Sequence, residues 1–190
     1  VEVALKRTYA KHPFIPKEGS GELEKALMIQ SIGLLSRLRH IGTKKVILGL
    51  SGVLDSTLAL IVAVEAFKRG SLPLSGIIGV TMPCFGTTSN SLRLAETLAQ
   101  HFTIPLRKID ITQAVVQHFE DIGHPQELHD ITYENSQARE RTQVLMDIAN
   151  QEGGIVLGTG DLSELALGWA TYNGDLMSMY AVNASVPKTL

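Results

Sequence analysis

The predicted fold depends on one stretch of the chain, Lys45-Val46-Ile47-Leu48-Gly49-Leu50-Ser51-Gly52-Val53-Leu54-Asp55-Ser56. Its first half is a short apolar run with β-branched residues, which is typical of a strand buried on both faces. The run ends at small residues, and an apolar helical pattern follows from Thr57 to Phe67. We therefore predict a buried strand that leads into a helix through a loop of small polar residues.

This loop has the chemistry of an anion-binding site. Free backbone N–H groups and the dipole at a helix start attract negative charge. Ser51 and Ser56 add hydroxyl donors, and Asp55 adds a carboxylate that suits a metal accompanying a polyphosphate. No Gly-Lys-Ser/Thr sequence closes the loop, so it does not match the Walker A pattern. A structural alternative is a Ser/Gly turn in which Asp55 caps the helix.

Length and composition indicate one ordinary globular domain. The chain has 190 residues, 44% of them hydrophobic and 19% charged, with a net charge of −2. This balance argues against a large nucleic-acid-binding surface, which needs a basic face. No apolar run reaches the roughly 18 residues of a membrane span. The single cysteine, Cys84, excludes an internal disulfide, fits a cytoplasmic location and is expected to be a small loop residue.

The remaining pattern alternates helices with strands. Helices are predicted over 22–40, 57–67, from about 90, over 112–121 and 135–150, and from 161; further strands are predicted over 75–82, 106–111 and 155–157. This order predicts an open parallel sheet with helices on both faces. The loops at 50–56, 82–90 and 158–164 should meet at its carboxyl edge, where such sheets bind ligands. The helix over 57–67 is apolar almost all round, so one face can pack on the sheet, and either another element of the chain or a second subunit in a homodimer or larger homo-oligomer should cover the other.

The first 20 residues mix charges with Pro13 and Pro16 and are expected to form a linker. The chain starts at Val1 and stops soon after a turn, so we expect residues 21–190 to be one domain of a longer protein, with its C-terminal part possibly incomplete.

A second cluster lies over 134–141. Asn135 and Arg139 are four residues apart on one helix face and could hold one ligand together, although a solvated surface arginine is the alternative for Arg139. Arg141 falls on the shoulder of the apolar face, where a partly buried pair with Glu134 is expected. We therefore expect Arg141 to stabilise the fold.

A third cluster lies over 158–172. A hydroxyl at a strand exit, Thr159, is followed within one helical turn by carboxylates, an arrangement suited to a nucleotide with magnesium. Asp161 and Glu164 also fit a helix N-cap and its capping-box partner. Trp169 could be a stacking platform, but its residue type alone favours core packing.

Several motifs together resemble one family. The loop at 51–56 resembles the Ser-Gly-Gly-x-Asp-Ser loop of the ATP pyrophosphatases. The motifs that follow in the family's order are Glu134-Asn135 with Ala138-Arg139, the run Gly158 to Trp169, and the segment Val182 to Leu190. Over nearly its whole length, the chain resembles the synthetase domain of glutamine-dependent NAD synthetases. The resemblance implies an adenine-nucleotide alpha-hydrolase-like fold, and residues 1–20 would follow a glutaminase domain.

The resemblance implies that ATP adenylates the nicotinate carboxylate of deamido-NAD and that ammonia, supplied from glutamine in the full-length enzyme, then displaces AMP. By residue-by-residue carry-over, Asp55 and Lys188 are catalytic, and Asp55 and Glu164 bind Mg²⁺. The residues expected to bind ATP are Gly49, Leu50, Ser51, Gly52, Val53, Leu54, Asp55, Ser56 and Thr159. Those expected to bind deamido-NAD are Asn135, Arg139, Glu164, Trp169, Ala170, Thr171, Tyr172 and Asp175.

Two features depart from the family pattern. Val53 stands where the family has its second glycine. If that position needs a positive φ or a close approach to phosphate, valine weakens the cradle by strain or crowding. The glutaminase half is not in these 190 residues, so we expect this chain by itself to use free ammonia.

Two other functions stay open. A related amidoligase or thiolase, such as a GMP synthetase or a tRNA-thiolating enzyme, shares the phosphate loop but should lack the run from Gly158 to Trp169. A catalytically impaired nucleotide-binding module would be consistent with Val53. Asp55, Arg139 and Glu164 favour an enzyme, because each supplies a charge that the reaction needs.

Overall fold

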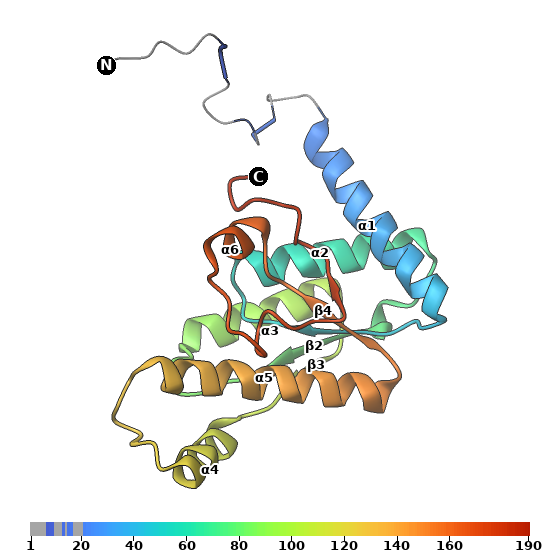
Figure 1. Cartoon of the computed structure of the whole chain (residues 1–190). Coiled ribbons are helices and arrows are strands. Elements are labelled where there is room, and N and C mark those ends of the chain that lie inside the picture. Colours follow the sequence, from blue (N-terminus) through green and yellow to red (C-terminus); the bar gives the residue numbers. More distant parts are fainter. Residues whose placement is uncertain (1–6, 10–12, 14, 17–20) are drawn as a thin grey trace, which may run out of the picture.

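The structure is a computed structural model of the chain, and it describes residues 7–9, 13, 15–16 and 21–190 (Figure 1). The linker predicted over 1–20 lies largely outside the described residues, so it stays a prediction. No helix in the described part of the chain is both long and apolar enough to cross a membrane.

Five parallel strands form one open sheet in the order β3-β2-β1-β4-β5. The strands are β1 (Val46–Gly49), β2 (Ile77–Thr81), β3 (Leu106–Lys108), β4 (Ile155–Gly158) and β5 (Tyr180–Ala181). β1 lies in the middle, where Ile47 is opposite Ile78 of β2 and Val156 of β4. Because both faces of this strand are covered, an apolar run without alternation is what β1 requires.

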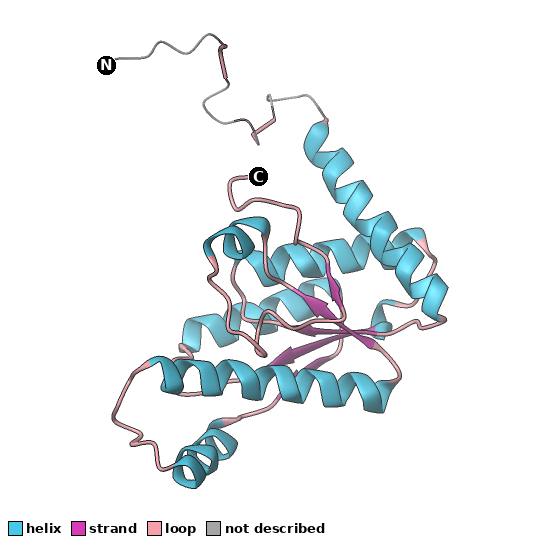
Figure 2. Ribbon diagram, in the orientation of Figure 1, coloured by secondary structure: helices cyan, strands magenta, loops and turns pink. Residues whose placement is uncertain are grey.

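Helices cover both faces of the sheet, as predicted (Figure 2). The helices are α1 (Glu22–Ile41), α2 (Leu54–Arg69), α3 (Ser89–Phe102), α4 (Thr112–Ile122), α5 (Ile131–Glu152) and α6 (Leu162–Leu167), and η1 (Leu74–Gly76) is a 3₁₀ turn before β2. On one face, α1, α2 and α3 pack around Val46 and Leu48 of β1. On the other, α4 and α5 pack around Ile47.

The all-apolar helix α2 is covered within this chain. Its Leu60 and Ala63 are fully buried, and Leu34 and Leu38 of α1 belong to the same core. α2 lies between the sheet and α1, so its pattern gives no reason to expect a second subunit.

Several predicted boundaries differ from the structure, and one strand was not predicted. α5 begins at Ile131 rather than near Asn135, because the Asp130 carboxylate caps it by accepting hydrogen bonds from Thr132 N and Tyr133 N. β3 ends at Lys108 instead of continuing to Ile111. The strand β5 was not predicted, because the two residues that pair with β4 are too few to form a recognisable hydrophobic pattern.

Candidate functional site

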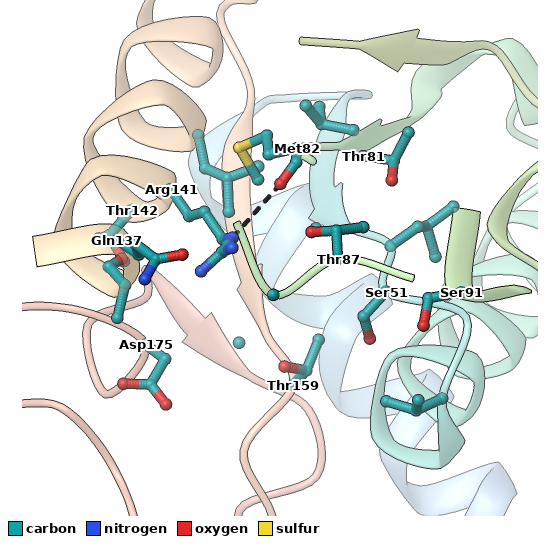
Figure 3. A pocket seen from close by; sticks show the side chains of 18 of the residues that line it. Ser51, Thr81, Met82, Thr87, Ser91, Gln137, Arg141, Thr142, Thr159 and Asp175 are labelled. Atoms are coloured by element: carbon teal, nitrogen blue, oxygen red, sulfur yellow. Dashed lines mark hydrogen bonds between the residues drawn. The ribbon is translucent and has the colours of Figure 1, made fainter. Parts of the chain in front are cut away.

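The loops after β1, β2 and β4 meet at the carboxyl edge of the sheet, as predicted, and surround a cavity of about 560 Å³ (Figure 3). Its apolar walls come from Val80, Met82, Leu145 and Val156. Its polar lining includes Ser51, Thr81, Thr87, Gln137, Arg141 and Thr159. The mixture of an apolar slot with a few converging polar groups is typical of a small-molecule site.

The loop at 51–56, predicted to bind phosphate, passes close to α3 before the start of α2. Gly52 adopts φ +79°, and a Cβ there would lie 2.7 Å from both Leu94 Cβ and Ser91 O of α3. Glycine is therefore required at this position for both its conformation and its space. Past the loop, the first N–H groups of α2 point out of the helix without an intrahelical acceptor. The Ser51 and Ser56 hydroxyls lie 3.1 Å apart beside them.

Val53, the residue that departs from the family pattern, is not strained. It is the N-cap of α2 with φ −103° and ψ 175°, an extended conformation open to any residue, and it is 53% exposed. Of the two ways in which valine could weaken the cradle, positive-φ strain is therefore excluded. Crowding remains, because Val53 lines the cavity. Since Val53 is the N-cap, the alternative that Asp55 caps α2 is wrong.

Three carboxylates converge on the ammonium of Lys188. Its Nζ lies 2.9 Å from Asp55 Oδ2, 3.2 Å from Glu164 Oε1 and 3.3 Å from Asp161 Oδ2. The hydrogen bond to Asp55 raises the pKa of Lys188 above its usual value, burial opposes this, and Glu164 and Asp161 add to the rise. Lys188 therefore stays protonated at any physiological pH.

The start of α6 holds two of these carboxylates in place. Asp161 Oδ1 accepts a hydrogen bond from Glu164 N at 2.8 Å, and Glu164 Oε2 accepts one from Asp161 N at 3.3 Å. This is the predicted capping box. The two oxygens that the capping box does not use, Asp161 Oδ2 and Glu164 Oε1, face Lys188. Asp161 Oδ2 has no hydrogen-bond partner elsewhere in the described residues.

A second cavity of about 140 Å³ continues the first. It shares Ser51, Val53 and Thr159 with the larger cavity and is lined in addition by Asp55 and Glu164. The described residues contain no group of three or more His, Cys, Asp or Glu arranged to hold a metal ion. Asp55 and Glu164 do converge on a single cation, Lys188 Nζ. Two carboxylates completed by substrate phosphates are a set that fits Mg²⁺.

The residues expected to bind deamido-NAD form a connected group beside the cavities. Asn135 Oδ1 accepts a hydrogen bond from Thr171 Oγ1 at 2.9 Å, and Arg139 Nε donates to Tyr172 O at 3.2 Å. Asp175 Oδ1 accepts one from Thr171 N at 2.6 Å. Asn135 and Arg139 thus act from one face of α5, as their four-residue spacing predicted, and their contacts are with the segment after α6; their joint hold on a ligand stays a prediction.

Not all predicted residues line the two cavities. Arg139 borders a separate cavity of about 450 Å³ between α4 and α5. Trp169 and Tyr172 are 75% and 79% exposed and border none of the three cavities. Core packing of Trp169 is therefore wrong: Gly168, at φ +71°, ends α6 and leads the chain out to the surface.

The predicted pair of Arg141 with Glu134 is wrong. Its Nε donates to Met82 O at 3.4 Å, its side chain lines the large cavity (Figure 3), and in the described part of the chain it forms no ion pair with Glu134. The helical wheel placed Arg141 correctly on the shoulder of α5, but that shoulder faces the open carboxyl edge.

Asn183 was not predicted to belong to the site. Its side chain is fully buried between two site loops, and no pattern in the neighbouring sequence indicates those contacts.

Comparison with known sequences finds similar proteins over nearly the whole chain. A model of the NAD synthase family matches residues 29–189. A glutamine-dependent NAD(+) synthetase of Mycobacterium tuberculosis (strain ATCC 25618 / H37Rv) is 46% identical over 197 residues, which cover 100% of this chain and 29% of the relative. The chain therefore spans less than a third of such a relative's length.

Solved structures share the fold. The glutamine-dependent NAD+ synthetase from Acinetobacter baumannii, in complex with ADP, has a TM-score of 0.81 at 31% identity and covers 87% of this chain and 31% of its own. An NH3-dependent NAD synthetase from Campylobacter jejuni has a TM-score of 0.78 at 23% identity, over 87% of this chain and 69% of its own. These neighbours confirm the predicted adenine-nucleotide alpha-hydrolase-like fold.

Proposed function

This chain belongs to the NAD synthase family, and from that membership we propose that its site converts deamido-NAD to NAD in two steps, the first of which consumes ATP. A carboxylate oxygen of the nicotinate attacks the α-phosphorus of ATP, and pyrophosphate leaves with the bond electrons. Ammonia then attacks the acyl carbon, loses a proton, and AMP leaves. Adenylation is needed because a free carboxylate is a poor electrophile.

ATP binds along the two joined cavities in this proposal. The adenosine occupies the apolar slot near Val80 and Met82, and the phosphates reach the start of α2. The A. baumannii relative solved with ADP supports a nucleotide here. Backbone N–H groups, the Ser51 and Ser56 hydroxyls, and Thr159 then face the phosphates.

Asp55 and Glu164 would hold Mg²⁺, which on binding neutralises phosphate charge. The protein's own cation is Lys188, whose charged ammonium lies between the same two carboxylates in this structure and would have to shift toward the phosphates to make room for the ion. As pyrophosphate leaves, negative charge grows on its oxygens, and Lys188 with the N-terminus of α2 stabilises that charge. The chain thus acts mainly by positioning two anionic substrates.

Deamido-NAD lies against the segment from Trp169 to Tyr172. Asn135, Arg139 and Asp175 hold that segment, and Glu164 and Ala170 connect it to the small cavity. The exposed indole of Trp169 suits stacking on the nicotinate ring. We further propose that the whole protein works in the cytoplasm with ammonia from a glutaminase domain.

The observation that carries the proposal is the convergence of Asp55, Asp161 and Glu164 on Lys188 next to the phosphate loop. The test is to incubate the chain with deamido-NAD, ATP, Mg²⁺ and ammonium and to measure NAD and pyrophosphate. Omitting ammonium is the control, and glutamine should not replace it. Amidation of xanthosine monophosphate instead would indicate a GMP synthetase, and ATP binding without any product would indicate a silent module.

A further inference from the structure

Asn183 joins three parts of the chain that are far apart in sequence. Its side chain is fully buried. Its Nδ2 donates to Asp55 O at 3.0 Å, in the first turn of α2, and to Thr159 O at 3.1 Å, in the loop after β4. Its Oδ1 accepts a hydrogen bond from Gln30 Nε2 of α1 at 3.3 Å.

These bonds use both donor hydrogens of the amide, one for each loop. The two loops carry the residues that face the substrate: Asp55 on the first, and Thr159 with the start of α6 on the second. Because one nitrogen atom, Asn183 Nδ2, donates hydrogen bonds to both carbonyl oxygens, it fixes the distance between the two loops. Because Asn183 is fully buried, removing its amide donors would leave both carbonyl oxygens without a partner at the position that its side chain fills.

Asn183 also begins the turn that delivers Lys188. Val186 N donates to Asn183 O at 2.9 Å, Leu162 N donates to Val186 O at 3.0 Å, and Lys188 N donates to Ser163 Oγ at 3.0 Å. This turn is therefore fastened to the start of α6. The side chain of Asn183 connects the turn to α2 as well.

We infer that Asn183 is a positioning residue that sets the spacing of Asp55, Glu164 and Lys188 for the nucleotide and its magnesium ion. The inference rests on the proposed function and deepens it. Asn183 itself lines none of the three cavities, so it acts through the loops that it joins.

Gln30 fixes which way the amide points. Its Nε2 also donates to Val182 O at 2.8 Å, which fixes the orientation of the Gln30 amide. The same nitrogen, a donor, therefore faces Asn183 Oδ1. Nδ2 is thereby directed at the two carbonyls. An Asn183→Asp substitution keeps the size but puts an oxygen against both carbonyls, which should push the loops apart. A Gln30→Met substitution, made on α1, leaves Asn183 in place and removes the group that orients its amide, together with the hydrogen bond to Val182 O.

The first test measures nucleotide and metal dependence. Asn183→Asp should raise both the KM for ATP and the Mg²⁺ concentration for half-maximal rate about tenfold or more. The KM for deamido-NAD should change much less. Gln30→Met should shift the same two quantities in the same direction by a smaller factor. The affinity for ADP with Mg²⁺, measured by calorimetry, should fall in parallel, which gives a readout independent of turnover.

The second test uses the free protein. Hydrogen–deuterium exchange should become faster at residues 53–57 and 159–164 in Asn183→Asp, with α4 unchanged. Glu152→Gln is the matched control, since it removes a carboxylate that pairs with Lys45 and Arg107 away from the site. It should lower the melting temperature without altering ATP or Mg²⁺ dependence.

The outcomes separate the two proposals. If the unaltered chain makes no NAD, the proposed function fails. If it makes NAD and Asn183→Asp lowers only the melting temperature, as Glu152→Gln does, the inference about Asn183 is wrong. Should Asn183→Asp not fold, Gln30→Met decides: unchanged ADP affinity and Mg²⁺ dependence would overturn the inference.

Discussion

Replacing Lys188 with methionine tests the charge cluster at the centre of the site. Buried hydrogen bonds to charged groups contribute about 1.5–3 kcal/mol each. The Lys188 side chain is 43% exposed, so solvent screening reduces its pairs with Asp55 and Glu164 to at most about 1 kcal/mol each. Asp161 differs, because its side chain is 4% exposed and its Oδ2 loses the one cation that pairs with it among the described residues.

The expected loss of stability on Lys188→Met is about 2 kcal/mol, which lowers the melting temperature by about 4–8 °C for a chain of this length. The effect on turnover should be larger, a decrease of about 100-fold or more, since a fixed positive charge is removed from beside the leaving pyrophosphate. Thermal melts monitored by circular dichroism and an ammonia-dependent NAD assay measure the two effects separately.

Lys45→Met is the matched control for this experiment. Lys45 also pairs with a carboxylate, Glu152 at 2.6 Å, but it precedes β1 at the opposite edge of the sheet. The control should lose stability and keep its turnover. If Lys188→Met kept a kcat within threefold of the unaltered chain, Lys188 would be a structural residue only, and our account of pyrophosphate departure would be refuted.

Three further predictions follow from the site. Val53→Gly should leave the melting temperature nearly unchanged, since Val53 is unstrained, and should lower the KM for ATP if the isopropyl group crowds the phosphates; equal KM values would show that the loop tolerates a side chain. Arg141→Ala should raise the KM for ATP, and Arg139→Ala should raise the KM for deamido-NAD, each with little change in melting temperature. A large loss of stability in Arg141→Ala would show that Arg141 mainly stabilises the fold. Hydrogen bonds from Lys45 and Arg107 hold the pKa of Glu152 below its usual value of 4.5. The ionised carboxylate therefore stabilises the fold above pH 4.5, and this contribution is lost as the pH falls through the lowered pKa. In Glu152→Gln, the stability measured during acid titration should lack this decrease.

Local features of the site could be predicted from sequence because neighbouring residues determine them. The capping box of Asp161 and Glu164 needs only a three-residue spacing. The phosphate loop needs a buried strand followed at once by a helix, and Asn135 and Arg139 share a face because they lie one helical turn apart.

Features that depend on distant segments could not be predicted. The direction of Arg141 depends on where the shoulder of α5 meets the loop after β2, which a helical wheel does not contain. The exposure of Trp169 depends on the left-handed turn at Gly168. Asn183 lies 153 residues from its partner Gln30, and no pattern in its own segment indicates that partner.

The close contact between Gly52 and α3 bears on which changes this loop can accept during evolution. A side chain at residue 52 would collide with the backbone of Ser91, whereas residue 53 is extended and open to solvent. Substitutions can therefore accumulate at position 53 without altering the path of the loop. Any replacement of Gly52 would instead have to be accompanied by a displacement of α3, which a single mutation cannot supply.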